Sequence, residues 1–391
     1  MREAVIVSGC RTPIGSFNGS LSQMPAARLG AVVIEEAIRR AALQKDQINE
    51  VIMGCVLAAG TGQAPARQAA IFAGLPESVE CLTVNKVCGS GLKSVMLAAQ
   101  AIALGDADII VAGGMESMSN APYLLEKARS GYRLGHAQLI DSLICDGLWD
   151  VYNDFHMGNA AELCAKECQV PRDAQDEFAT LSYRRALDAQ KSCRFKDEIV
   201  SVQIPQKVGA PTTVSEDEEP KKAQFDRISS LKPAFQKDGT VTAANASKIN
   251  DGAAAVVVMA GEVAERLGLK TLARIVSFAS VAKKPEWFTT APADVIPKVL
   301  QKAGLTKNDI DLFEINEAFA VVNLAVNKML GLDMAKVNVN GGAIALGHPI
   351  GASGARILVT LLHAMKQREA KRGMAAICIG GGEASGMIVE R

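Results

Sequence analysis

The segment Leu43-Gln44-Lys45-Asp46-Gln47-Ile48 recurs later in the chain as Leu305-Thr306-Lys307-Asn308-Asp309-Ile310. Three further matches keep the same order along the chain: Ala4-Val5-Ile6-Val7-Ser8 with Ala273-Arg274-Ile275-Val276-Ser277, Ser90-Gly91 with Ser353-Gly354, and Gly113-Gly114-Met115-Glu116 with Gly381-Gly382-Glu383. One such match can arise by chance, but four in order at an offset of about 260–270 residues indicate an internal duplication. The sequence therefore predicts two homologous halves.

Each half alternates apolar strands with helices. The elements expected in the first half are strands at Val5–Val7, Val51–Val56, Leu82–Val84 and Ile109–Val111, and helices at Arg28–Leu43 and after Cys88. Short apolar strands separated by helices are typical of sheets that are covered on both faces. We therefore expect an α/β fold, divided into a first half (1–118 with about 250–270), an insertion (119–249) and a second half (271–391).

The inserted segment has no counterpart in the other half. It contains two stretches with helical character, Asn159–Cys168 and Arg172–Ala189, and the acidic run Glu216-Asp217-Glu218-Glu219. We expect it to lie over the active site.

Composition limits the classes of function. The 391 residues are 49% hydrophobic and carry no net charge, so no overall basic field favours a nucleic acid or a membrane surface. The start of the chain lacks the features of a signal or transit peptide, and we expect no apolar stretch of the roughly 18 residues needed to span a membrane. Nine cysteines, an odd number without metal-like pairs, favour a reducing compartment. We expect a cytoplasmic protein.

Three glycine-dense turns carry groups that can handle protons. They contain Cys88 (within Asn85–Gly91), His348 (within Gly341–Gly354) and Cys378 (before Gly380-Gly381-Gly382). Glycine weakens regular structure but allows a ligand to approach the backbone closely, so these turns suit reacting groups. The helix after Cys88 should lower the pKa of its thiol by about one unit, which leaves the thiol mostly protonated and in need of a base such as His348.

In order, the segments Asn85-Lys86-Val87-Cys88-Gly89-Ser90-Gly91, Asn316-Glu317-Ala318-Phe319-Ala320, Gly347-His348-Pro349-Ile350-Gly351 and Cys378-Ile379-Gly380-Gly381-Gly382 match four motifs of the thiolases. The chain resembles this family from Ala4 to its end. The resemblance implies the thiolase fold, a duplicated five-layer α-β-α-β-α sandwich with an inserted CoA-binding loop domain, and usually a homotetramer.

The resemblance also implies a reaction and its catalytic residues. Cys88 would attack acetyl-CoA, His348 would take its proton, and Cys378 would remove the α-proton of a second acetyl-CoA. Asn316 would act with a water beside His348, and the backbone N–H groups of Cys88 and Gly380 would form an oxyanion hole. The products would be acetoacetyl-CoA and CoA, formed reversibly through an acetyl-cysteine and without a cofactor other than CoA as substrate and product.

Further residues are expected around the substrate. Phe155-His156-Met157-Gly158 resembles the short-chain thiolases, in which the His-Met pair lies near the acyl group. The other positions that match pantetheine contacts are Leu148, Leu231, Phe235, Ala246, Ser247, Ala318 and Phe319. Lys221, Lys222 and Arg227 are candidates for the CoA phosphates. Lys248 stands where these enzymes usually have glycine, so the position of Ser247 is in question.

Other interpretations remain open. A broader-range degradative 3-ketoacyl-CoA thiolase is the nearest, although His156-Met157 argues against it. A ketoacyl synthase usually has a histidine in place of Cys378, and a cysteine hydrolase would need water as its acceptor. An inactive CoA-binding scaffold is the alternative of another class. Cys164 and Cys168 share a helix face but have no second ligand pair, so we expect no metal site.

Overall fold

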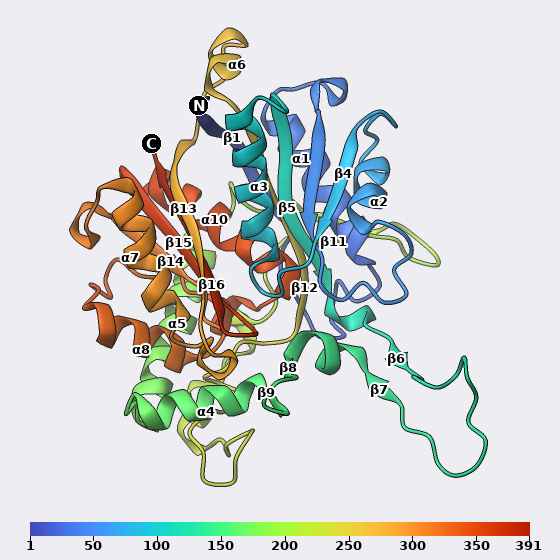
Figure 1. Ribbon diagram of the computed structural model, residues 1–391, viewed down its shortest axis with the longest axis vertical. Coiled ribbons are helices and arrows are strands. Elements are labelled where there is room, and N and C mark those ends of the chain that lie inside the picture. The colour runs from blue at the N-terminus through green and yellow to red at the C-terminus, as the bar shows by residue number, and fades with distance from the viewer.

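A single mixed sheet organises the computed structural model, which describes residues 1–391 (Figure 1). Its strand order is β14-β15-β16-β13-β1-β12-β5-β3-β4, with the short β2 (Gly15–Ser16) paired to β12. The strands span Ala4–Arg11 (β1), Glu50–Gly54 (β3), Glu80–Val84 (β4), Ile109–Ser117 (β5), Asn250–Ala260 (β12), Ala273–Ala282 (β13), Leu312–Ile315 (β14), Arg372–Ile379 (β15) and Glu383–Glu390 (β16).

The sheet consists of two halves that meet where β1 pairs with β13, through Val5–Arg274 and Ile6–Ala273. Counted outward from this seam, the strand order is β1-β12-β5-β3 in the first half and β13-β16-β15-β14 in the second. In each half, the first strand along the chain lies next to the last one, which is followed by the next-to-last strand and then by an earlier strand. The repeated six-residue segments also match, because each forms a 3-10 turn closed by a capping box, from Gln44 to Gln47 and from Thr306 to Asp309. The predicted duplication is confirmed.

Helices complete the five layers. On the outer side of the first half lie α1 (Ala26–Arg40) and α2 (Pro65–Phe72), and on that of the second lie α7 (Ala291–Ala303) and, beside it, α8 (Ala320–Leu330). Between the halves run α3 (Ser90–Leu104) and α10 (Ile350–Gln367) (Figure 1). The expectation that no apolar stretch reaches membrane-spanning length is wrong, because Val87–Leu104 does by length and composition. Its apolar character fits its position in the central layer, between β5 and α10.

Glycines let the two central helices touch through their backbones. A Cβ on Gly91 of α3 would lie 2.7 Å from the backbone nitrogen of Ala355, and one on Gly354 of α10 would lie 2.4 Å from that of Leu92. Any larger residue would push the helices apart. This crossing brings the N-terminal ends of α3 and α10 together, and each of these ends follows one of the glycine-dense turns.

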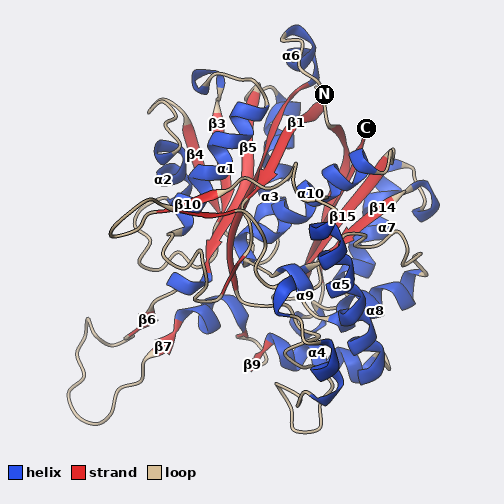
Figure 2. Cartoon of the chain, turned by 180° about the vertical axis from the view of Figure 1, so that it is seen from behind, coloured by secondary structure: helices blue, strands red, loops and turns tan.

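The part of the inserted segment from β6 to α4 extends below the sandwich, whereas β10 lies beside the first half (Figure 2). The inserted segment holds β6 (Tyr123–Leu124), β7 (Ile140–Asp141), β8 (Trp149–Asp150), β9 (Phe155–His156), α4 (Met157–Glu167), α5 (Arg172–Lys191), β10 (Val202–Ile204) and β11 (Thr212–Val214). Both α4 and α5 pack against α8, and α5 also packs against the short α9 (Ala343–Leu346). The remaining short helix, α6 (Gly261–Arg266), follows β12. The exact domain boundaries stay a prediction.

Candidate active site

One cavity of about 270 Å³ collects most of the predicted site residues. Eleven of them line it: Cys88, Leu148, His156, Met157, Phe235, Ala246, Ser247, Ala318, Phe319, His348 and Gly380. Six more residues complete the wall, namely Met118, Gly147, Lys248, Ile249, Phe288 and Ile350. A mainly apolar cavity with a few convergent polar groups is the usual form of a small-molecule site.

Cys88 lies on a strained turn directly before α3. Val87 has a φ of 44°, which a β-branched residue rarely adopts, so the surrounding contacts must hold it there. Ser90 supplies part of that support: its hydroxyl accepts from the Lys86 backbone nitrogen at 2.8 Å and donates to the Val87 carbonyl at 2.6 Å. An ion pair between Lys86 and Glu383 also connects this turn to the strand that follows the Gly380–Gly382 turn.

Two backbone N–H groups, those of Gly380 and of Cys88 itself, face the Cys88 sulfur. They favour the thiolate, but burial outweighs them and raises the pKa of the Cys88 thiol to about 11. The backbone N–H groups act in the direction expected of the helix start, but the cost of desolvating the thiolate, which that expectation did not include, is larger. The consequence drawn from it stands, since a protonated Cys88 requires a base.

His348 is held in one tautomer. Its Nδ1 lies 2.6 Å from the Ser353 hydroxyl, and that hydroxyl donates its one proton to the Pro349 carbonyl at 2.9 Å. The hydroxyl must then accept from His348, so Nδ1 carries the ring proton and Nε2 has a free lone pair. No group of the chain bonds to Nε2. Burial, together with the charge of Arg356, lowers the pKa of His348 to about 3, so the ring is neutral at pH 7.

The backbone of His348 is fixed as well. Its N–H donates to Asn250 Oδ1 at 2.9 Å, and Asn250 Nδ2 donates to the Gly15 carbonyl at 2.9 Å. Gly347 has a φ of 114°, and a Cβ there would lie 2.5 Å from the Asn250 side chain. The glycine before the histidine is thus required both by backbone conformation and by space.

Cys378 and Asn316 lie behind the cavity wall. Cys378 is the next-to-last residue of β15 and is 1% exposed; burial and then the nearby Cys88 raise the pKa of its thiol. Asn316 follows β14 and is also 1% exposed, and neither its Oδ1 nor its Nδ2 has a partner in the chain. A buried amide with unused hydrogen-bonding capacity is unusual and consistent with a role toward a ligand. The specific roles of both residues stay predictions.

An aromatic group closes the other side of the cavity. The His156 ring stacks on Phe235, with centroids 4.9 Å apart and planes 20° apart, and Phe235 meets Phe319 edge-on. His156 caps α4 by accepting the Gly158 N–H at Nδ1, at 3.0 Å, so its proton is on Nε2. Burial lowers the pKa of His156. The neutral His156 ring, with its Nε2–H, and the ring of Phe235 therefore line the same cavity as Cys88.

A second cavity, of about 280 Å³, adjoins the first and shares Lys248 with it. Leu231 lies here and not on the wall of the inner cavity, together with the predicted cations Lys222 and Arg227. Lys221 does not line it and pairs with Glu216 instead. The Lys248 ammonium donates to the carbonyls of Ala243 and Ala246, and burial lowers its pKa to about 8.

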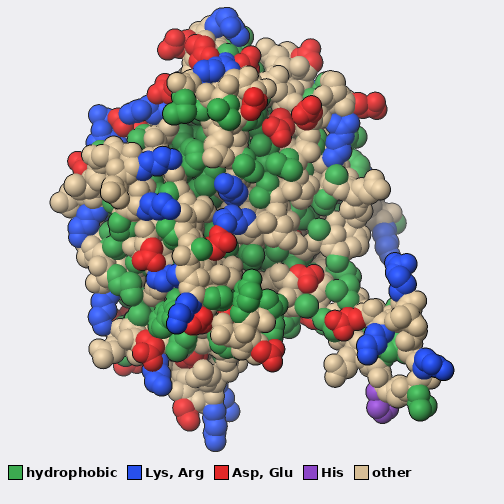
Figure 3. Space-filling view, viewed as in Figure 1, with side chains coloured by type: hydrophobic (Ala, Val, Ile, Leu, Met, Phe, Trp, Pro, Cys, Tyr) green, Lys and Arg blue, Asp and Glu red, His purple; other side chains and the backbone are tan.

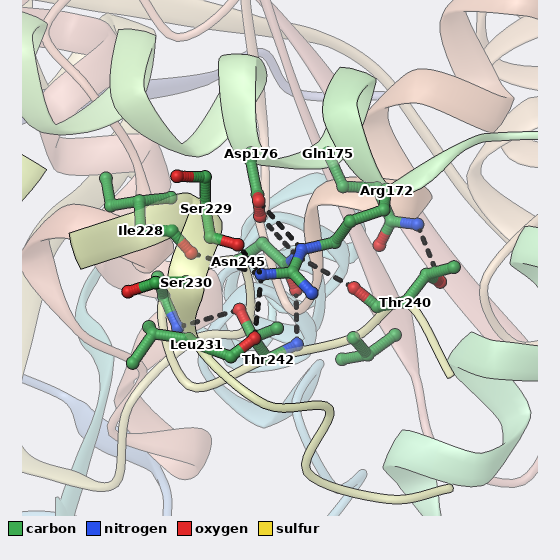
Figure 4. Close-up of polar contacts among 12 residues, drawn as sticks. Arg172, Gln175, Asp176, Ile228, Ser229, Ser230, Leu231, Thr240, Thr242 and Asn245 are labelled. Atoms are coloured by element: carbon green, nitrogen blue, oxygen red, sulfur yellow. Dashed lines mark hydrogen bonds and ion pairs between the residues drawn. The ribbon is translucent and has the colours of Figure 1, made fainter. Parts of the chain in front are cut away.

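A polar network fixes the loops around both cavities to α5 (Figure 4). Arg172 pairs with Asp176 at 2.7 Å and donates to the carbonyls of Ile228, Ser229 and Leu231. Asn245 donates to Asp176 at 2.9 Å and to the Thr240 carbonyl at 3.0 Å. The loop that carries Leu231 and the loop that leads to Ala246 therefore share one anchor.

The sequence interpretation missed the residues that orient the reacting groups, above all Ser353 and Asn250. Ser353 was matched to Ser90 as part of the repeat, and both hydroxyls prove to organise the turn before a central helix. Their place in the glycine-rich motifs was the available signal. No group of three or more His, Cys, Asp or Glu side chains lies close enough together to hold a metal ion.

Comparison with known proteins identifies the family. The profile described as the N-terminal domain of thiolase matches residues 4–262, and the profile of the thiolase C-terminal domain matches residues 269–391. The chain is 57% identical to an acetyl-CoA acetyltransferase of Cupriavidus necator and 53% identical to one of Pseudomonas aeruginosa, each over the full length of both proteins. It is 53% identical to the mitochondrial acetyl-CoA acetyltransferase of Bos taurus, covering all of this chain and 92% of the relative. With both profiles matched and full-length relatives sharing more than half of its residues, the chain belongs to the thiolase family.

Proposed function

We propose that this protein is an acetyl-CoA C-acetyltransferase, which condenses two molecules of acetyl-CoA to acetoacetyl-CoA and CoA and also catalyses the reverse thiolysis. One observation carries the proposal: a cysteine thiol and the free Nε2 of a neutral, tautomer-fixed histidine line the same cavity. The curated relatives that match over their full length have the name of this activity.

The first half-reaction forms an acetyl-cysteine. His348 Nε2 removes the Cys88 proton as the sulfur attacks the thioester carbonyl, which avoids a free buried thiolate. The oxygen that becomes negative lies where the N–H groups of Cys88 and Gly380 converge. When the carbon–sulfur bond to CoA breaks, Cys378 gives its proton to the departing thiolate, so CoA leaves as a thiol, Cys378 becomes a thiolate and the imidazolium keeps the Cys88 proton.

The second half-reaction forms the carbon–carbon bond. Cys378, as the thiolate, takes a proton from the methyl group of a second acetyl-CoA, and the resulting enolate attacks the acetyl carbonyl on Cys88. Cys88 leaves as a thiolate and regains its proton from the His348 imidazolium, Cys378 keeps the proton of the methyl group, and acetoacetyl-CoA is released. The raised pKa of Cys378 makes it a protonated acid at rest, which suits the reverse direction, where it protonates the departing enolate of acetyl-CoA.

The substrate would enter through the second cavity, the outer one, which Leu231, Lys222 and Arg227 line. The pantetheine arm would pass Lys248, which both cavities share, and Leu231, while Lys222 and Arg227 are in a position to meet the CoA phosphates. The acyl group would end against His156 and Met157. CoA acts as substrate and product, and no other cofactor is part of the proposal.

The test is a thiolysis assay with acetoacetyl-CoA and CoA, followed by the loss of the 3-ketoacyl absorbance, with 3-ketohexanoyl-CoA in parallel. Fast loss of the four-carbon substrate alone would support the proposal. Comparable rates on both would favour the broader-range degradative thiolase. No rate on either, for a folded protein, would refute the proposed activity and leave the CoA-binding scaffold.

We further propose a cytoplasmic homotetramer. The excursion between β6 and β7, residues 125–139, is almost entirely exposed and includes Leu134 and Leu139 at 101% and 66%. It extends away from the body and carries Lys and Arg side chains (Figure 3). Apolar side chains presented in this way suit a contact with another copy. Light scattering of the wild type and of a variant lacking residues 127–137 would test this, since only the wild type should be tetrameric.

A further inference from the structure

One buried carboxylate next to the site has no part in the mechanism above. Glu116 lies near the end of β5 and is 0% exposed. Its Oε2 accepts the backbone N–H of Val56 at 3.0 Å and of Gly351 at 2.9 Å, and its Oε1 accepts that of Leu57 at 3.2 Å. Burying a carboxylate without a cationic partner costs free energy, and here three backbone N–H groups offset part of that cost. Such an arrangement indicates that the carboxylate has a role at this position.

These contacts reach the catalytic machinery through Gly351. This residue is in the first turn of α10, three positions after His348, and a Cβ there would lie 2.6 Å from Glu116 Oε2. The glycine of the Gly-His-Pro-Ile-Gly motif therefore allows the carboxylate to approach the helix backbone. Ile350, between His348 and Gly351, belongs to the wall of the inner cavity.

We propose that Glu116 is a positioning residue of the acyl-transfer site: its carboxylate holds the start of α10, and with it His348, while its charge keeps Cys88 in the thiol form until His348 takes the proton. Burial is the main cause of the raised pKa of Cys88, and the charge of Glu116 adds to it. The proposal rests on the proposed function for its effect on rate.

The hydrogen-bond donors around Glu116 favour its ionised form, although burial opposes it. Besides the three N–H groups, the Cys55 thiol donates to Oε1 at 3.7 Å, so every neighbour offers a hydrogen and none offers an acceptor. The titratable groups that face it are Cys55 after β3 and Cys88 before α3, and on β12 its partner Gly252 carries no charge. Burial raises the pKa of Glu116 to about 7, so it is ionised at the higher pH at which thiols react.

Two substitutions separate position from charge. Glu116→Gln removes the charge and turns an amide NH₂ toward a backbone donor, so kcat for thiolysis should fall by up to about 100-fold. The pH midpoint for alkylation of Cys88 by iodoacetamide, measured on the Cys88 peptide by mass spectrometry, should move down by about 0.5–1 unit. Glu116→Asp keeps the charge but shortens the reach to Gly351, so kcat should fall while the midpoint stays.

Glu198→Gln is the matched control. Glu198 is also 0% exposed and also contacts α10, but at Thr360, far from the active-site end of the helix, and unlike Glu116 it pairs with a cation, Arg11, at 2.6 Å. It should leave both kcat and the Cys88 midpoint close to those of the wild type, whatever it does to thermal stability.

Unchanged kcat and midpoint in folded Glu116→Gln would overturn the proposal, as would an equal shift of the midpoint in Glu198→Gln. If Glu116→Gln fails to fold, Glu116→Asp decides: lower kcat with an unchanged midpoint supports the proposal, and unchanged kcat overturns it. A wild type without thiolysis would refute the proposed function instead, and the alkylation midpoints would still show whether Glu116 controls Cys88.

Discussion

Replacing Ser353 by alanine should slow acetyl transfer without weakening substrate binding. The Ser353 hydroxyl is the only acceptor within reach of His348 Nδ1, and it can accept only because its own proton goes to Pro349. In the Ser353→Ala variant the buried Nδ1–H has no partner. The tautomer with Nδ1 unprotonated, in which Nε2 cannot act as a base, then becomes competitive.

The structure sets the size of the effect. Ser353 is 0% and His348 5% exposed, so bulk water cannot readily replace the lost bond. An unsatisfied buried donor costs about 1–3 kcal/mol, which corresponds to a loss of the productive tautomer of about 5- to 150-fold. The rate constant for acetylation of Cys88 should fall by this factor.

Rapid-mixing measurement of Cys88 acetylation by acetyl-CoA, with steady-state thiolysis alongside, would test this prediction. The KM for acetoacetyl-CoA should change little, because Ser353 does not line the cavity. Ser94→Ala is the control: it removes an equally buried helix hydroxyl that bonds only to the Ser90 carbonyl. An acetylation rate within about twofold of the wild type in Ser353→Ala would refute the tautomer argument.

Three further predictions concern the same centre. Cys378→Ser should still become acetylated at Cys88 by radioactive acetyl-CoA but condense very slowly, and an unlabelled Cys88 would contradict the assigned role. Gly354→Ala should lower the free energy of unfolding by about 1–3 kcal/mol in denaturant titrations, because its Cβ would lie 2.4 Å from the backbone nitrogen of Leu92; unchanged stability would contradict the close crossing. Between pH 6.5 and 5, the free energy of unfolding of His348→Gln should rise by about 2 kcal/mol relative to that of the wild type. The pKa of His348 is lowered in the folded protein, so only the unfolded wild type binds a proton at this position in that pH range and the wild type loses stability. A difference that stays constant with pH would contradict burial of the neutral ring.

The fold could be predicted in outline from the sequence because the relevant signals lie within short segments or occur in both halves of the chain. The duplicated segments predicted two equivalent halves, and the alternation of strands and helices predicted their layers. Boundaries were less accurate: the strand expected at Ile109–Val111 continues to Ser117 through alanine and glycine. These small residues carry little strand signal, yet they are required where β5 passes under α10, since a Cβ on Gly114 would lie 2.1 Å from the Gly351 carbonyl.

What the sequence could not predict depends on contacts between distant segments. The acidic run gave no sign that Asp217 would pair with Arg11 in the interior, 206 positions away, with both side chains 0% exposed. The raised pKa of Cys88 could not be predicted for the same reason, because the burial that outweighs the backbone N–H groups is a property of the assembled fold. Leu231 reached a neighbouring cavity because the path of its loop is set by Arg172, which no pattern near Leu231 indicates.

The duplication explains why the reacting groups meet, although the two halves carry different chemistry. The helices α3 and α10 precede equivalent strands of the repeat, β5 and β15, and their glycines force a close crossing near their N-terminal ends. Two helix starts, each with a turn organised by a serine hydroxyl, therefore face one cavity. One turn presents a sulfur and the other an imidazole, so a symmetric scaffold supplies a nucleophile and its base at a fixed separation. A substitution that widens the crossing should consequently impair both functions together, whereas Ser353→Ala should impair only the base.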